Sequence, residues 1–132
     1  MSIEGGAGIR IAVVDDEKML LNVFSSLMKQ YNYHADFFSN PQKALEMIID
    51  DPARYKLVIT DIRMPQMDGI TFAKRIRAII PKLPIMFMTG EVSDESREQA
   101  LALGNVAFLE KPFPLEETLK VSIPMFLGKT EK

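Results

Sequence analysis

Five short apolar runs alternate with five stretches of helical periodicity along this chain of 132 residues. An apolar run bounded by turn residues is typical of a strand buried on both faces of a sheet. Strands that alternate with helices predict a parallel sheet covered on both faces and joined by right-handed crossovers. The predicted strands cover residues 9–14, 34–39, 57–61, 84–89 and 106–109. We therefore expect an α/β domain with a doubly wound five-stranded sheet.

Cap residues indicate where the helices between these strands begin and end. Asn40 and Asp68 stand directly before helical patterns, and each can accept a hydrogen bond from a free amide of the first turn. Ser93 or Asp94 can do the same for the helix that follows the fourth strand. Gly104 can then supply the left-handed residue that ends this helix.

The two ends of the chain are expected to differ from its body. Residues 1–8 are rich in glycine and predict a flexible segment. Residues 9–127 predict one domain, and residues 128–132 predict a C-terminal tail. Pro124 lies inside the last helical pattern, and its missing N–H and its ring should kink or end that helix.

The composition limits which class of protein this chain can belong to and which kinds of functional site it can contain. It is 47% hydrophobic and 26% charged, as soluble globular domains are. A net charge of −2 implies no strong attraction to nucleic acid or to an anionic membrane. The absence of cysteine excludes disulfides and thiolate sites. No membrane-spanning run and no secretion signal is visible, so a cytoplasmic protein is the default expectation.

Polar and charged side chains follow four of the predicted strands. Asp15 and Asp16 follow the first strand, Asp61 ends the third, Thr89 ends the fourth and Lys111 follows the fifth. Parallel strands end at the same edge of the sheet, which is where ligands bind in open α/β folds. These side chains should therefore lie close together.

The chemistry of this set suggests a metal beside an anion site. Three crowded carboxylates repel one another unless a cation is present. Carboxylate ligands with waters suit Mg²⁺. A hydroxyl and an ammonium nearby can bind the oxygens of a phosphoryl group. The combination is typical of phosphoryl transfer to a carboxylate nucleophile.

Four stretches of the sequence carry a likeness to a known family. They read VVDDE, VITDIRMPQMDG, PIMFMTG and FLEKPF. With these motifs, residues 9–123 resemble the receiver domain of two-component response regulators, the CheY-like superfamily. The resemblance implies a flavodoxin-like sheet of strand order 2-1-3-4-5 with five helices.

The same resemblance implies roles for residues at the ends of the first, third and fourth strands. Asp61 would be the phosphoacceptor. Asp15 and Asp16 would hold Mg²⁺ together with Asp61 and the backbone carbonyl of Arg63. Thr89 would bind a phosphoryl oxygen and relay the change as part of a switch.

Further roles fall on residues in and after the fifth strand. Lys111 would pair with the phosphoryl group, and its peptide bond to Pro112 would be cis, as is common in the family. Phe108 would be the switch aromatic that turns inward on phosphorylation. Pro124 departs from the family pattern, because it lies inside helix five, which in the family forms the usual partner surface together with helix four and strand five.

The resemblance also implies partners and a mode of action. The phosphodonor would be a sensor histidine kinase or a histidine phosphotransfer protein, and an unknown downstream protein would read the result. We expect no direct binding of nucleic acid or membrane, and a monomer or a phosphorylation-dependent dimer. The domain would be a switch and not an enzyme, catalysing at most its own phosphorylation and dephosphorylation.

Three other interpretations stand beside this one. A phosphatase of the haloacid-dehalogenase type needs a second acid two residues after its nucleophile, and Arg63 is there instead. A nucleotide or flavin binder needs a glycine-rich loop after the first strand, where Asp15, Asp16 and Glu17 stand. Finally, the chain could be the receiver portion of a longer regulator or could act alone through protein contacts.

Overall fold

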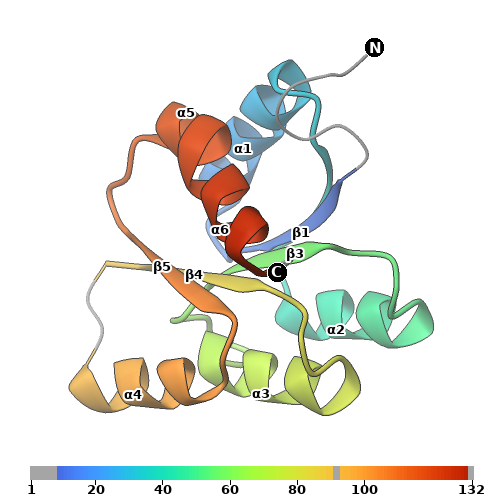
Figure 1. Ribbon diagram of the computed structural model, residues 1–132, viewed down its shortest axis with the longest axis vertical. Coiled ribbons are helices and arrows are strands. Elements are labelled where there is room, and N and C mark those ends of the chain that lie inside the picture. The colour runs from blue at the N-terminus through green and yellow to red at the C-terminus, as the bar shows by residue number, and fades with distance from the viewer. Residues whose placement is uncertain (1–8, 91–92, 131–132) are drawn as a thin grey trace.

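A single parallel sheet forms the centre of the molecule (Figure 1). The computed structural model describes residues 9–90 and 93–130. Within these residues the sheet has five strands in the order β2-β1-β3-β4-β5, and every neighbouring pair is parallel. The strands are β1 (Arg10–Val14), β2 (His34–Phe38), β3 (Leu57–Asp61), β4 (Ile85–Thr89) and β5 (Val106–Glu110). The predicted fold class and the strand order implied by the resemblance are confirmed.

Helices cover both faces of this sheet (Figure 1). Helices α1, α5 and α6 lie on one face, and α2, α3 and α4 lie on the other. The bounds are α1 (Lys18–Gln30), α2 (Pro41–Asp50), α3 (Gly69–Ile79), α4 (Asp94–Ala102), α5 (Leu115–Glu117), the π-helix η1 (Thr118–Ser122) and α6 (Ile123–Thr130). Because α5, η1 and α6 follow one another without a gap, they form one helical segment, the fifth.

The predicted caps are present at the helix starts. The side chains of Asn40 and Asp68 accept hydrogen bonds from the amides of Gln42 and Thr71. The Ser93 side chain accepts one from the Ser96 amide, so Ser93 and not Asp94 caps α4. At the other end of α4, Gly104 has a φ of +73°, the left-handed conformation expected of it.

Two apolar clusters, one on each face of the sheet, make the core. One joins α2, α3 and α4 to the sheet, and the other joins α1 and the C-terminal helical segment to it. All five residues of β3 and all five of β4 are buried. The central strands are thus rigidly packed, and the residues at their ends are held firmly in place.

We expected Pro124 to kink or end its helix. The helix does not end there, but the turn before Pro124 is π-helical, so its regular α-helical geometry is disturbed. The π-helical turn η1 precedes it, and helical structure continues to Thr130. A π-helical bond from residue 124 would go to the carbonyl of Leu119, but proline has no N–H to donate. The hydroxyl of Tyr33 donates to that carbonyl at 2.8 Å. A side chain from the connection between α1 and β2 therefore supplies the missing donor.

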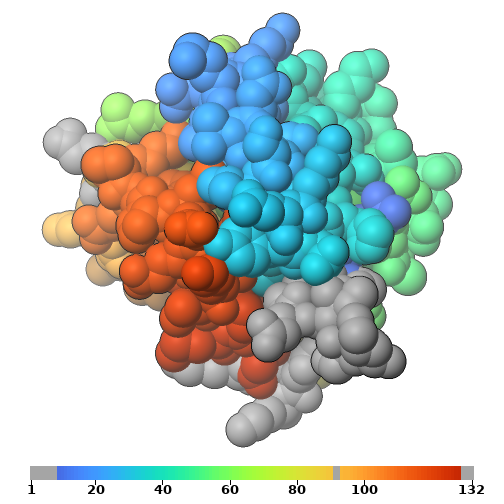
Figure 2. Space-filling model, turned by 90° about the horizontal axis from the view of Figure 1, so that it is seen from above, coloured from blue at the N-terminus to red at the C-terminus, as the bar shows by residue number. Residues whose placement is uncertain are grey.

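Tyr33 stands just beyond α1, and α1 lies beside the C-terminal helical segment (Figure 2). Tyr31 adds a second contact, because its hydroxyl donates to a carboxylate oxygen of Glu116 at 2.7 Å. The two tyrosines together attach the C-terminal helical segment to the end of α1.

Helix α6 continues past residue 127, where we expected the domain to end, so residues 128–130 are helical. The expected flexible segment, residues 1–8, lies outside the described residues, as do residues 131 and 132. Among the helices that the structure describes, none is both long enough and apolar enough to cross a membrane.

Candidate functional site

The four strand ends that carry polar residues meet at one edge of the sheet. Asp15 directly follows β1, Asp61 ends β3, Thr89 ends β4 and Lys111 directly follows β5. Strands β1, β3 and β4 are adjacent and parallel, and β5 pairs with β4. The parallel topology alone therefore brings these residues together, as the sequence predicts.

Three carboxylates form a cluster within this edge. One ligand oxygen from each of Asp15, Asp16 and Asp61 lies within 4.8 Å of the other two. Asp15 is fully buried, Asp61 is 9% exposed and Asp16 is exposed. The inner part of the cluster is thus buried, and its outer part is exposed to solvent. An ion could reach it from solvent.

Hydrogen bonds fix the orientation of the Asp61 carboxylate. Its Oδ1 accepts from the amide of Ile62 at 2.7 Å and from the amide of Arg63 at 3.4 Å. Its Oδ2 accepts from the ammonium of Lys111 at 3.2 Å. One oxygen is held by the backbone and the other faces a positive charge, so the carboxylate has a defined direction.

Glycine at position 69 allows the chain to pass close behind Asp61. A Cβ at Gly69 would overlap the carbonyl oxygen of Asp61 and would lie 2.9 Å from the Cα of Ile62. The Gly69 amide also donates to the Ile62 carbonyl at 2.6 Å. The start of α3 therefore supports the backbone that carries Asp61.

Lys111 is the cation of the cluster. Its Nζ lies 3.1 Å from Asp15 Oδ2, 3.2 Å from Asp61 Oδ2 and 3.3 Å from Glu17 Oε1. Burial alone would lower the pKa of Lys111, but the nearby carboxylates of Asp15 and Asp61 outweigh it and raise this pKa. Lys111 therefore keeps its charge.

For the pKa of Asp15, burial outweighs the neighbouring positive charge and hydrogen bonds. Burial raises the pKa of Asp15 above its usual value, and the Glu17 amide and the Lys111 ammonium only partly offset this. The amide of Glu17 donates to Asp15 Oδ1 at 2.8 Å. A divalent cation would favour the charged form of this carboxylate.

The residues present fit Mg²⁺. The donors of the cluster are oxygen atoms of carboxylates, which are the ligands that a hard cation prefers. The described residues contain one such group of three acids, at the predicted positions. A carbonyl ligand from Arg63 stays a prediction.

Thr89 and Phe108, the predicted switch residues, lie on neighbouring strands. Phe87 pairs with Phe108, and Thr89 pairs with Glu110. Side chains two residues apart point to the same face of a sheet, so Thr89 and Phe108 are diagonal neighbours on the face that α4 covers. Thr89 is 3% exposed, and Phe108 is half-buried.

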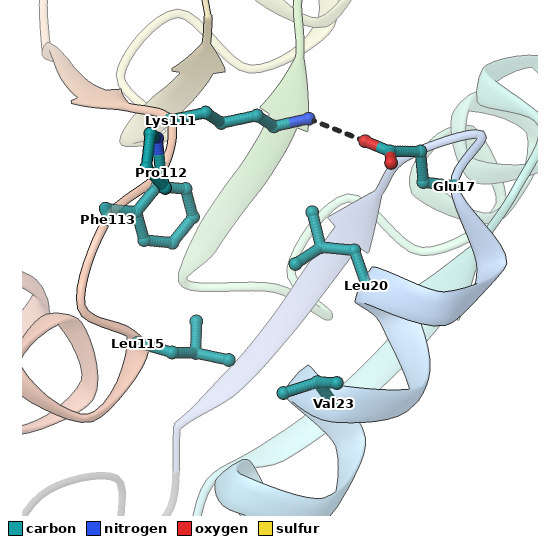
Figure 3. Close-up of a pocket in the computed structure, with 7 residues that line it drawn as sticks. All are labelled: Glu17, Leu20, Val23, Lys111, Pro112, Phe113 and Leu115. Carbon is teal, nitrogen blue, oxygen red and sulfur yellow. Dashed lines mark hydrogen bonds and ion pairs between the residues drawn. The ribbon is translucent and has the colours of Figure 1, made fainter.

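A groove opens beside the acid cluster, between α1 and the segment after β5 (Figure 3). Its volume is about 460 Å³. The ion pair of Glu17 and Lys111 stands at one end of it, and the Lys111–Pro112 peptide bond is cis, as the resemblance implies. The other residues that line it are Leu20, Val23, Phe113 and Leu115.

Two neighbours of the predicted site were not identified from the sequence. Glu17 contacts Lys111, and its place in a run of three acids was the available signal. Arg97 of α4 lies over the Phe108 ring, with 4.5 Å between its Cζ atom and the ring centroid. No signal in the sequence pointed to this second contact, because it depends on how α4 is rotated.

Curated relatives of the chain are response regulators. The chain is 33% identical over 108 residues to the response regulator receiver protein CpdR of Brucella abortus, covering 82% of this chain and 88% of that protein. It is 32% identical over 122 residues to the transcriptional regulatory protein ZraR of Escherichia coli, covering 92% of this chain and 27% of ZraR. The chain thus spans about a quarter of the length of ZraR.

Solved structures with the same fold include a chemotaxis protein and a receiver domain. Chemotaxis protein CheY4 of Vibrio cholerae superposes with a TM-score of 0.79 at 28% identity, covering 89% of this chain and 98% of CheY4. The beryllofluoride-activated NtrC4 receiver domain dimer also gives 0.79 at 28%, covering 92% and 98%. The model of the response regulator receiver domain matches residues 11–122. The chain therefore belongs to the response regulator receiver domain family.

Proposed function

We propose that this domain is a phosphorylation-operated switch in which Asp61 accepts the phosphoryl group. The observation that carries the proposal is the position of Asp61, which lies in one cluster with Asp15 and Asp16 and 3.2 Å from Lys111. A domain of this family is a signalling switch and not an enzyme that turns over separate substrates.

The proposed donor is a phosphohistidine of a sensor histidine kinase or of a histidine phosphotransfer protein. An oxygen of Asp61 attacks the phosphorus atom and forms a P–O bond. The P–N bond to the imidazole breaks, and its electron pair leaves with the imidazole. The backbone amide of Ile62 holds the carboxylate in place during this attack.

The surrounding residues would stabilise the charge of the transferring group. The Lys111 ammonium, now 3.2 Å from Asp61, would pair with a phosphoryl oxygen. The Thr89 hydroxyl would bind another. Mg²⁺, held by Asp15, Asp16, Asp61 and the backbone carbonyl of Arg63, would supply further positive charge beside the phosphoryl oxygens.

Phosphorylation would be read by a downstream protein. We propose that Thr89 and Phe108 transmit the change to the surface formed by α4, β5 and the C-terminal helical segment. The dimeric NtrC4 receiver is a precedent for association in the activated state.

Mass spectrometry tests the proposed acceptor. Incubation with acetyl phosphate and Mg²⁺ should add a single phosphoryl group to the intact protein. Asp61→Asn should abolish this gain while leaving the circular dichroism spectrum and the unfolding transition in place. Full labelling of the variant at one site would show that another carboxylate is the acceptor. Transfer from a phosphorylated histidine phosphotransfer domain then tests the proposed donor.

A further inference from the structure

The ring of Phe108 has two defined contacts in this structure. It stacks on Phe87, a fully buried residue of β4, with 5.7 Å between ring centroids and 28° between ring planes. The guanidinium of Arg97 lies over the same ring, 4.5 Å from its centroid. A cation at this distance is attracted by the negative face of the ring.

Arg97 is available for this contact because it forms no ion pair in the described part of the chain. No carboxylate of those residues lies within ion-pair distance of its guanidinium. Phe108 has no hydroxyl that could fix its ring by a hydrogen bond. The position of the ring therefore depends on packing against Phe87 and on the attraction to Arg97.

Helix α4 has few other attachments to the sheet. Of its residues, all of which the structure describes, Ala100 alone is buried. Its C-terminal end is fixed by Arg77 of α3, whose guanidinium donates to the carbonyls of Leu103 at 3.1 Å and Gly104 at 2.6 Å. The contact of Arg97 with Phe108 thus holds the half of α4 that lies farther from this anchor.

Arg97, Phe108 and Thr89 are connected through the sheet. Phe108 pairs with Phe87, and Thr89 follows Phe87 by two residues on the same face of β4. A shift of Thr89 toward a phosphoryl group would open space next to the Phe108 ring. Movement of the ring into that space would take it away from Arg97.

We propose that Arg97 is a positioning residue of the switch, which holds the Phe108 ring in its unphosphorylated place and joins it to α4. This inference rests on the proposed function. The cation–π contact belongs to the resting state, so it opposes activation. Its loss shifts the equilibrium toward the active state, because only the resting state is destabilised.

Beryllofluoride titration in the presence of Mg²⁺ measures this equilibrium, because a phosphoryl mimic binds the active state preferentially. Arg97→Gln keeps a side chain of similar polarity but removes the charge. We expect it to bind beryllofluoride about two- to fivefold more tightly than the parent, the low end of the range for cation–π contacts, because both side chains are only half-buried. Arg97→Lys keeps a cation and should give a smaller change.

A double-mutant cycle separates this role from a general effect of charge. In a Phe108→Leu background there is no ring, so Arg97→Gln should leave beryllofluoride affinity unchanged. Arg75→Gln removes the same charge from an exposed position of α3 and should also change nothing. Thermal unfolding of each variant shows whether it is folded.

The outcomes distinguish the inference from the proposed function. If the parent protein binds no beryllofluoride, the proposed function fails. If the parent binds it and Arg97→Gln has unchanged or weaker affinity, the proposed function stands and the inference about Arg97 is wrong. An equal effect of Arg97→Gln in the Phe108→Leu background also overturns the inference, because the effect then does not pass through the ring.

Discussion

The ammonium of Lys111 lies 3.2 Å from Oδ2 of Asp61, so a positive charge already stands at the carboxylate before any phosphoryl group arrives. The same ammonium contacts Asp15, which is fully buried. One lysine therefore compensates the charge of both buried acids in the metal-free protein. Its removal should affect stability as well as phosphorylation.

We expect Lys111→Ala to destabilise the metal-free protein. Removing one partner of a fully buried ion pair costs roughly 3–5 kcal/mol. The loss here should be at or below the lower end of this range, because Lys111 is partly exposed and Asp15 can take up a proton. Urea unfolding in EDTA measures it. Lys74→Ala, at an exposed position of α3, is the matched control and should change stability little. Equal stabilities of the two variants would mean that Lys111 does not compensate these acids.

Asp16 is the exposed member of the acid cluster, and its substitution tests the metal site. Asp16→Asn removes one of three repelling charges, so the metal-free protein should melt at a higher temperature. Mg²⁺ at ten times its dissociation constant should stabilise the parent by about 1.4 kcal/mol, a shift of a few degrees. The variant should respond less.

Thermal unfolding in EDTA and in a Mg²⁺ series at constant ionic strength separates binding from general screening. A lower metal-free melting temperature of Asp16→Asn would argue against repulsion within the cluster. A full Mg²⁺ response of this variant would show that Asp16 is not a ligand.

Gly69 offers a test of how the backbone supports Asp61. A methyl group at this position overlaps the Asp61 carbonyl oxygen, so Gly69→Ala must displace that backbone. We expect a loss of about 1–3 kcal/mol in stability, as overpacking typically causes, together with slower phosphorylation by acetyl phosphate. Gly128→Ala is the control, because nothing lies near its added Cβ and alanine favours a helix. Unchanged phosphorylation of a folded Gly69→Ala protein would mean that the carboxylate tolerates the displacement.

The acid cluster could be predicted because it depends on the topology. Parallel strands end at one edge, so Asp15, Asp61 and Lys111 had to converge once the alternation of strands and helices was recognised. The caps at Asn40 and Asp68 could be predicted because a capping bond is local.

The remaining contacts depend on tertiary packing that no local pattern encodes. The helix α4 reads DESREQALA and has no clear apolar face, so its rotation and the position of Arg97 over Phe108 could not be derived. The continuation of the helix past Pro124 could not be predicted for a similar reason. The donor that replaces its missing N–H, Tyr33, is distant in sequence.

Two buried tyrosines predict how stability should depend on alkaline pH. Burial raises the pKa of Tyr33 to about 12, and burial with a hydrogen bond to Asp36 raises the pKa of Tyr55 to about 12. The hydroxyl of Tyr55 donates to Asp36 Oδ2 at 2.6 Å. Both phenols have a value of 10.0 when unperturbed, so the unfolded chain releases these protons first as pH rises.

The contribution of each phenol to stability should therefore be fully present below pH 10 and lost as pH rises from about 10 to about 12. Each should add a slope of up to about 1.4 kcal/mol per pH unit in this window. Urea unfolding at a series of pH values measures the slope, and tyrosinate absorbance follows the ionisation directly. The Tyr55→Phe variant has no phenol to ionise at position 55. Its stability should therefore fall less steeply with pH than that of the parent, whatever its stability at neutral pH. If both proteins show the same slope, the Tyr55 hydroxyl already ionises normally in the folded state, and its burial beside Asp36 does not hold it neutral.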